Sequence, residues 1–312
     1  MSVDVEEWFQ VGAFERVIAR GDWDGLESRV VRNTGAVLDL FEAAGVTATF
    51  FTLGWVADRH PALIRRIVAA GHELASHGWD HRRVFTMTPA EFRADLARAR
   101  VALEDAGGVG VAGYRAPSFS IDARTLWAHP VLAEEGYIYS SSVAPVRHDH
   151  YGWRDAPRYA FRPLADAALI EVPVTVAEIA GRRVATGGGF FRLLPAALTD
   201  LAVRQVNRDG QPAMFYFHPW EIDPGQPRVR NAPLRSRLRH YSRLRAMPGK
   251  LRRLLERHKW GRVDEALTRL AHTYPRHPGL DPGSRFVGAD VRIHEKSGTP
   301  GQARGDEVGA VA

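Results

Sequence analysis

The sequence predicts an α/β fold built on a largely parallel sheet or barrel. Short runs of β-branched and aromatic residues alternate with helical segments through about residue 145, which is typical of parallel strands joined by crossover helices. A composition of 45% hydrophobic and 25% charged residues allows a packed core. The length of 312 residues suffices for one large domain or two small ones.

Each predicted element rests on a local pattern. Residues 2–6 alternate small or apolar side chains with acidic ones, which predicts a strand that runs into a loop. Residues 25–44 carry apolar side chains at helical spacing and end at Gly45, a common helix stop. The β-branched and aromatic run over residues 46–53 predicts a buried strand. Similar patterns predict helices over 61–71, 89–106, 126–136 and 195–207, strands over 72–77, 137–142, 169–176 and 213–218, an irregular stretch over 114–120 and a loop-rich one over 148–163.

The C-terminal end differs in composition from the rest of the chain. Beyond about residue 270, proline and glycine are frequent and apolar residues are few. Such a segment cannot bury enough apolar surface to offset the entropy of ordering it. A disordered tail is therefore predicted over residues 271–312, after a folded domain over residues 1–270.

The composition excludes several kinds of site. The chain contains no cysteine, so disulfides, thiolate metal sites and a cysteine nucleophile are excluded, and any metal must be bound by His and carboxylate groups. No run of roughly 18 apolar residues is present. Residues 1–10 carry Asp4, Glu6 and Glu7 instead of the basic start and apolar stretch of a signal peptide. These features predict a cytoplasmic protein and leave association with a membrane surface open.

Positive charge is concentrated in one segment. From Arg228 to Arg262, thirteen Arg or Lys residues accompany a single acid, Glu256, which gives a net +12 in a chain whose total is +6. A peripheral contact with a membrane surface or with nucleic acid fits this charge, and so does an ordinary solvated helix face. Only three of the 42 basic residues are Lys, so a compositional bias toward Arg favours the ordinary interpretation. No nucleic-acid partner is expected.

The strongest candidate for a metal site is the sequence His77-Gly78-Trp79-Asp80-His81. Two histidines four residues apart lie on one side if the backbone turns helically, so both can bind one ion. The motif follows a predicted strand and opens a loop, which is where α/β proteins place their sites. The spacing alone is weak evidence, because thirteen His residues will sometimes fall four apart by chance.

Acidic residues at the end of the first predicted strand can complete such a site. Asp4 and Glu6 are two residues apart, and carboxylates at this spacing point the same way on a strand. One of them can be the third metal ligand and the other a base. The alternative is an exposed acidic N-terminus.

Three further motifs are candidates for related chemistry. Arg115 precedes the stiff step Ala116-Pro117, so it can be held in a fixed pose against a carboxylate, or it is an ordinary surface Arg. His218 ends an apolar strand ahead of a proline and is a candidate general acid, or a satisfied core His. The run Gly187-Gly188-Gly189 lacks the Lys and Ser/Thr of a phosphate-binding loop, and we interpret it as a flexible loop that presents aromatic residues.

Taken in order, these motifs resemble those of the polysaccharide deacetylases, the NodB-homology group also called carbohydrate esterase family four. The resemblance covers about residues 1–270 and is greatest to a subgroup found beside exosortase-linked exopolysaccharide clusters, on the basis of residues 2–11, 187–192 and 215–224. It implies a distorted (β/α) barrel and a catalytic domain over 1–270 with a family-specific part from about residue 150. The implied activity is metal-dependent removal of N-acetyl groups from a polysaccharide or oligosaccharide, in exopolysaccharide biosynthesis.

The resemblance also implies roles for individual residues. Asp4 would be the catalytic base, Arg115 would hold it, and His218 would be the acid. His77 and His81 would bind the metal ion. Many family members have two adjacent aspartates at the first strand, whereas Asp4 is followed here by Val5, Glu6 and Glu7. We choose Glu6 as the carboxylate ligand because it shares a face with Asp4, and Glu7 remains the alternative.

The donor set and the nearby aromatic residues suggest the remaining components of the site. Two imidazoles and one carboxylate suit zinc best, and Co, Mn or Ni are also allowed. Side chains expected to contact the sugar are Trp79, Pro117, Phe190 and Trp220.

Other functions are compatible with the same motifs. An allantoinase-like hydrolase of a small cyclic or linear amide would use the same metal site. A non-catalytic glycan-binding protein would be indicated by loss of Asp4 or of a histidine ligand, and none of these is lost. A protein that acts on nucleic acid or a membrane surface would rely on residues 228–262.

Overall fold

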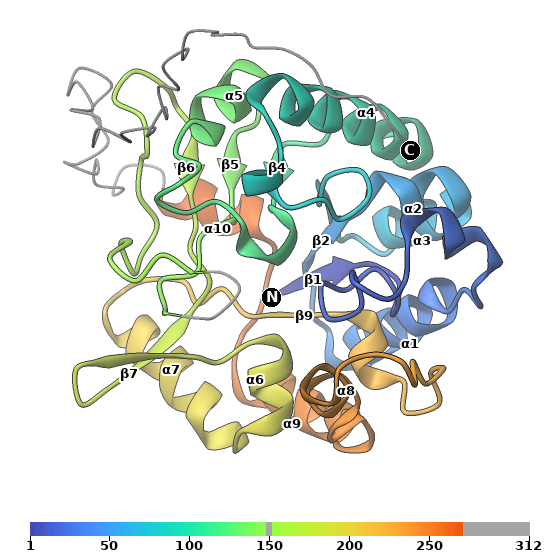
Figure 1. Ribbon diagram of the computed structural model, residues 1–312. Helices are drawn as coiled ribbons and strands as arrows, with labels where there is room; N and C mark the ends of the chain where they lie inside the picture. Colours follow the sequence, from blue (N-terminus) through green and yellow to red (C-terminus); the bar gives the residue numbers. More distant parts are fainter. Residues whose placement is uncertain (148–151, 271–312) are drawn as a thin grey trace, which may run out of the picture. The chain divides into compact units, whose positions relative to one another are not determined.

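The computed structural model describes residues 1–147 and 152–270 (Figure 1). The predicted disordered tail, residues 271–312, lies outside this part of the chain, as do four residues of the predicted loop 148–163.

A seven-stranded sheet forms the centre of the described chain. Its strands are ordered β6-β5-β4-β3-β2-β1-β9, and every neighbouring pair is parallel. The sheet is open between β6 and β9, so it is an incomplete barrel. Its strands are β1 (Ser2–Val5), β2 (Thr49–Thr52), β3 (Glu73–Ser76), β4 (Gly113–Tyr114), β5 (Tyr139–Ser140), β6 (Ile170–Glu171) and β9 (Tyr216–Phe217), and a separate antiparallel hairpin joins β7 (Val176–Ile179) to β8 (Arg182–Ala185).

Helices surround the sheet, and their ends follow the capping rules. Figure 1 shows α1, α2 and α3 beside β1 and β2, and α4 and α5 beside β4 and β5. Thr88 and Glu91 form a capping box at the start of α4, which ends at Gly108 in a left-handed conformation. The helices are α1 (Val30–Ala44), α2 (Gly54–Arg59), α3 (Pro61–Ala69), α4 (Pro89–Gly107), α5 (Ala128–Glu134), α6 (Gly188–Leu193), α7 (Ala196–Arg208), α8 (Leu234–Tyr241), α9 (Met247–Arg257) and α10 (Val263–Leu270), and 3-10 turns cover Arg20–Gly25, Val84–Thr86, Pro117–Phe119, Pro219–Ile222 and Leu244–Ala246.

Most of the predicted elements are confirmed, and the differences have local causes. The helix predicted over 25–44 begins only at Val30, after the 3-10 turn Arg20–Gly25 and a connecting segment over residues 26–29. The strand predicted over 169–176 is divided, with β6 ending at Glu171 and β7 beginning at Val176. None of the helices within residues 1–147 and 152–270 is both long and apolar enough to cross a bilayer.

The parallel arrangement brings distant segments of the chain to one rim. The carboxyl ends of parallel strands lie at the same edge of a sheet. Asp4 is the third residue of β1, and His77 directly follows β3. Arg115 directly follows β4, and His218 directly follows β9. The predicted site residues therefore share this rim although they span more than two hundred positions in the sequence.

Candidate active site

Three buried side chains at the rim form a compact group of potential metal ligands. Glu6 follows β1, and His77 and His81 lie in the loop after β3. One ligand atom from each residue lies within 4.8 Å of the other two. The structure thus brings together the ligand set suggested by the sequence, and binding of a metal there stays a prediction.

His77 is oriented by a backbone carbonyl. Its Nδ1 lies 2.8 Å from the carbonyl oxygen of Arg115, so Nδ1 carries the proton and the lone pair of Nε2 remains free. Burial lowers the pKa of His77 to about 4, so its imidazole is neutral near pH 7. A neutral imidazole in a fixed tautomer is the form that binds a metal ion.

The Glu6 carboxylate has one occupied and one unoccupied oxygen. The indole N–H of Trp220 donates to Glu6 Oε1 at 3.1 Å. Oε2 lies 2.9 Å from His81 Nε2, yet it accepts no well-oriented hydrogen bond from any described residue. Burial alone would raise the pKa of Glu6, but the imidazoles of His81, His218 and His77 outweigh burial and lower the pKa to about 2. A buried, ionised oxygen that faces His81 without a well-oriented hydrogen bond fits a cation shared with the two histidines.

The loop that carries the two histidines is not helical, yet it brings both imidazoles to one side. Gly78 (φ +75°) and His81 (φ +62°) both adopt left-handed backbone conformations. A Cβ on Gly78 would lie 2.8 Å from Oδ2 of Asp95. The same oxygen accepts the backbone N–H of Trp79 at 3.1 Å. Asp95 of α4 therefore holds the loop in the conformation that turns both imidazoles toward Glu6.

Glu7 has a different partner, which distinguishes it from Glu6. Its carboxylate accepts the backbone N–H groups of Arg29 and Val30 at 3.0 and 3.1 Å, and the hydroxyl of Ser28. These donors lie at the start of α1, where the N–H groups of the first turn lack helical partners. Because Glu7 caps α1, the geometry favours Glu6 as the carboxylate ligand.

Asp4 and Arg115 form a buried ion pair. Arg115 Nη1 donates to Asp4 Oδ1 at 2.5 Å and to the Ser2 hydroxyl at 2.9 Å. Its Nε and Nη2 donate to the carbonyl and hydroxyl oxygens of Ser141 at 3.1 and 2.9 Å. Arg115 is completely buried, so the alternative of a surface Arg is excluded. The second carboxylate oxygen, Asp4 Oδ2, lies 3.9 Å from His218 Nε2.

His218 is oriented by a second buried ion pair, between Glu221 and Arg192. Glu221 Oε2 accepts the backbone N–H of His218 at 3.0 Å and lies 3.2 Å from its Nδ1. Arg192 Nε donates to Glu221 Oε1 at 2.7 Å. The side chain of His218 is 18% exposed, whereas those of Glu221 and Arg192 are almost fully buried. Of the three linked side chains, only the imidazole of His218 reaches solvent.

The charges around His218 change its protonation. Burial by itself would lower the pKa of His218, but the carboxylates of Glu6, Glu221 and Asp4 outweigh it and raise the pKa to about 9. These charges favour the protonated form of His218.

The glycine run at 187–189 has a packing role, which corrects its interpretation as a flexible loop. Gly188–Leu193 is the helix α6, and Phe191 and Arg192 are each 1% exposed. A Cβ on Gly187 would lie 2.5 Å from the ring of Tyr216. This segment therefore contacts β9 so closely that only glycine fits at position 187. The close approach lets Arg192 reach Glu221.

The ring of Trp220 packs against two imidazoles, and its contact with a sugar stays a prediction. Its ring stacks on His218 with centroids 5.1 Å apart and on His240 with centroids 4.2 Å apart. Only 6% of the residue is exposed. Trp220 orients Glu6 and supports His218.

The other three predicted sugar contacts lie in different surroundings. The ring of Trp79 lies 3.5 Å from the guanidinium of Arg98, which belongs to α4. It also packs against Gly54 at the start of α2. Pro117 is buried and faces Gly78. Phe190 is half-buried in α6. Contact of these residues with substrate stays a prediction.

Sequence reasoning missed Arg192 and Glu221 as supports of the site. One signal was available, because His218-Pro219-Trp220-Glu221 has the spacing of a capping box, in which a glutamate reaches back to the residue three positions earlier. Arg192 lies 29 residues before Glu221, and no local pattern links them.

Two family models match consecutive parts of the chain. Residues 23–134 match a model described as polysaccharide deacetylase, and residues 141–268 match a domain of unknown function, DUF3473. The first segment contains His77, His81 and Arg115, and the second contains His218.

The chain is also similar to curated deacetylases over part of its length. A stretch of 139 residues, 45% of this chain, is 32% identical to a chitooligosaccharide deacetylase of Bradyrhizobium sp. (strain ANU 289) and covers 58% of it. A stretch of 107 residues, 34% of this chain, is 33% identical to a peptidoglycan-N-acetylglucosamine deacetylase of Listeria monocytogenes and covers 22% of it. The matched stretches thus span less than two thirds of either relative.

Solved structures confirm the predicted fold. A protein of Mycobacterium smegmatis assigned as a polysaccharide deacetylase matches with a TM-score of 0.58 at 22% identity, over 89% of this chain and 91% of that one. An allantoinase matches with a TM-score of 0.52 at 19% identity, over 78% of this chain and 74% of that one. Both comparisons support an α/β fold with a curled parallel sheet.

Proposed function

We propose that the protein is a metal-dependent hydrolase that removes N-acetyl groups from a polysaccharide or oligosaccharide, on the premise that residues 23–134 match a model described as polysaccharide deacetylase. One observation carries the proposal. His218 Nε2 lies 3.9 Å from Asp4 and 3.7 Å from Glu6, so a candidate acid, a candidate base and the ligand group share one small volume. The names of the relatives, which act on chitooligosaccharide and on N-acetylglucosamine of peptidoglycan, support an N-acetylated glycan as substrate.

Glu6, His77 and His81 would hold a divalent ion. When bound, such an ion polarises the amide carbonyl as a Lewis acid and lowers the pKa of the attacking water. The donor set suits zinc, and Co, Mn and Ni also fit it.

Asp4 would take the proton of the attacking water. Arg115 occupies Asp4 Oδ1, so Oδ2 is the oxygen left to accept a proton. As the water oxygen bonds to the acetamide carbon, its proton passes to this oxygen. Arg115 holds the base in place through its further bonds to Ser2 and Ser141.

His218 would protonate the leaving nitrogen as the C–N bond breaks, which releases acetate and a free amine. With Nδ1 donating to Glu221, its Nε2 faces Asp4 and Glu6. The carboxylates around His218 raise its pKa, which favours the protonated form that an acid requires.

The catalytic domain would extend over residues 1–270. The proposed acid lies in the second matched segment, and Asp4 and Glu6 precede both. Neither matched segment alone therefore contains the whole set. A role in exopolysaccharide biosynthesis is part of the proposal and rests on the resemblance of residues 2–11, 187–192 and 215–224.

Acetate release from a panel of N-acetylated glycans, with a small cyclic ureide included, tests the proposal. We expect acetate from at least one glycan, loss of the activity with a chelator, and recovery on addition of a divalent ion. Hydrolysis of the ureide without acetate release would instead indicate an amidohydrolase. Glycan binding without turnover at any metal concentration would indicate a non-catalytic protein.

A further inference from the structure

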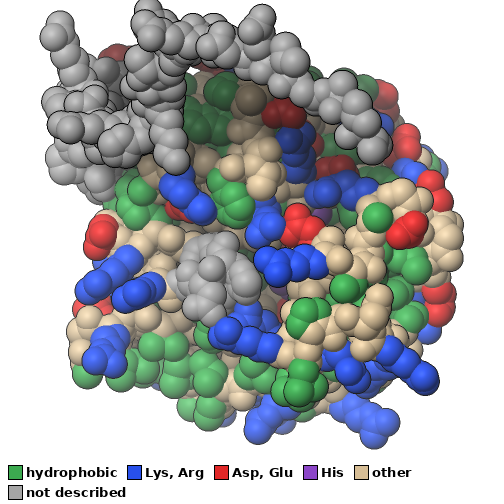
Figure 2. All heavy atoms as spheres, in the orientation of Figure 1, with side chains coloured by type: hydrophobic (Ala, Val, Ile, Leu, Met, Phe, Trp, Pro, Cys, Tyr) green, Lys and Arg blue, Asp and Glu red, His purple; other side chains and the backbone are tan. Residues whose placement is uncertain are grey.

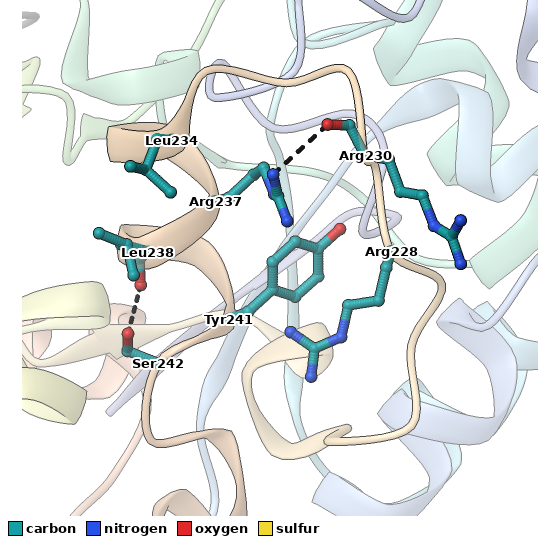
Figure 3. Close-up of a pocket in the computed structure, with 7 residues that line it drawn as sticks. All are labelled: Arg228, Arg230, Leu234, Arg237, Leu238, Tyr241 and Ser242. Carbon is teal, nitrogen blue, oxygen red and sulfur yellow. Dashed lines mark hydrogen bonds between the residues drawn. The ribbon is translucent and has the colours of Figure 1, made fainter.

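The exposed face of α8 carries apolar side chains that the fold does not bury. Leu234 and Leu238 lie one helical turn apart and are 66% and 59% exposed. The opposite face holds the helix in place, because His240 is buried against Trp220. Figure 3 shows both leucines on α8, across a depression from the loop that carries Arg228 and Arg230.

Three arginines border the same depression. Arg228, Arg230 and Arg237 line it together with the two leucines, and its volume is about 510 Å³. Arg228 lies over the ring of Tyr241 at 4.3 Å, and Arg237 donates to the carbonyl oxygen of Arg230 at 3.5 Å. Within the described residues none of the three arginines forms an ion pair.

The surroundings add to this positive charge. The segment 228–262 carries a net +12, from thirteen basic residues and one acid. Lys and Arg side chains lie along the part of the surface in Figure 2 where Figure 1 places α8 and α9. An anionic partner of extended area would therefore be attracted to this face.

We propose that the α8 patch, defined as Arg228, Arg230, Leu234, Arg237 and Leu238, docks on a bilayer surface that contains anionic phospholipids. The guanidinium groups would bind lipid phosphates, and the two leucines would enter the boundary between headgroups and acyl chains. A nucleic acid would use the arginines but leave both leucines in water, so the combination favours a lipid surface. Because the proposal concerns a surface outside the candidate active site, it does not depend on the proposed hydrolase activity.

Docking at this patch would place the bilayer close to the candidate active site. His240 of α8 stacks on Trp220, and the indole of Trp220 donates to Glu6. One aromatic side chain thus separates α8 from the ligand group.

Sedimentation of the full chain with vesicles tests the proposal. We expect binding to vesicles of phosphatidylcholine mixed with phosphatidylglycerol, weaker binding as salt is added, and little binding to phosphatidylcholine alone. The triple variant Arg228→Gln/Arg230→Gln/Arg237→Gln should lower partition by roughly 100-fold, about fivefold per charge. Leu234→Ser/Leu238→Ser should lower it by about tenfold while leaving the charge unchanged.

A second triple variant, Arg16→Gln/Arg65→Gln/Arg182→Gln, is the matched control, because these arginines are exposed and lie outside the patch. It should retain most of the vesicle binding, and thermal unfolding should verify that all variants are folded. If both triple variants lost vesicle binding equally, the binding would depend on net charge alone, and the proposal would be overturned. Unchanged binding in the leucine variant together with full competition by duplex DNA would overturn it in favour of a nucleic-acid surface.

Discussion

Substitution of Glu221 by Gln tests whether the contacts from Arg192 through Glu221 orient the proposed acid, His218. Glu221 is completely buried, and its oxygens face Arg192 Nε at 2.7 Å and the backbone N–H and Nδ1 of His218 at 3.0 and 3.2 Å. An amide has one oxygen and one NH2 group, so it must turn the NH2 toward one of these donors. The substitution also removes an anion that raises the pKa of His218.

Two effects of different size are expected from Glu221→Gln. Breaking a buried ion pair costs about 3–5 kcal/mol when one charge is left uncompensated. Arg192 keeps bonds to the carbonyl oxygens of Arg239, His240 and Ser242, so we expect a smaller loss of about 2–3 kcal/mol in the free energy of unfolding. Misplacement of a general acid should lower kcat by about 10²- to 10⁴-fold.

Comparison of two substrates separates catalysis from stability. Hydrolysis of an N-acetylglucosamine oligomer requires protonation of an amine, whereas 4-nitrophenyl acetate releases a stable phenolate without it. If the protein hydrolyses both, Glu221→Gln should slow the amide far more than the ester. Glu73→Gln is the matched control, because Glu73 is also a buried carboxylate but belongs to β3 and bonds to Thr49 and Tyr139. An unchanged ratio of the two rates in Glu221→Gln would refute the role of Glu221 in positioning the acid.

Three further predictions follow from the same structure. Glu6→Gln and His77→Ala should reduce bound divalent metal to less than about a tenth of wild type in a folded protein, as measured by elemental analysis, because each removes one of three ligands; full occupancy would contradict the site. Asp4→Asn should keep the metal and lose turnover by at least about 10²-fold, and near-normal acetate release would assign the base elsewhere. Burial lowers the pKa of His72 to about 4, from 6.5, so the unfolded chain takes up the proton first as the pH falls. Stability should therefore decrease from pH 6.5 to 4 by up to about 3 kcal/mol, and denaturant unfolding of His72→Gln should show a smaller decrease; equal pH slopes would contradict this prediction.

Local patterns in the sequence predicted much of the fold and part of the candidate site. Hydrophobic periodicity and helix stops predicted the alternation of strands and helices, because these signals lie within a few residues of each other. The strand-end positions of Asp4, His77 and His218 indicated a common rim, because parallel strands share their carboxyl edge.

Tertiary contacts decided what local patterns left open. Glu6 and Glu7 are adjacent and chemically alike, and only the start of α1 distinguishes them by engaging Glu7. The sequence showed an aromatic ring at Trp220, but its exposure depends on His218 and His240, which cover its faces. Arg192 and Glu221 carry no shared local signal, and their pairing requires the close approach of α6 to β9. Periodicity reports which side of an element is buried, whereas the partner of a buried polar group depends on where segments distant in sequence meet in the folded chain.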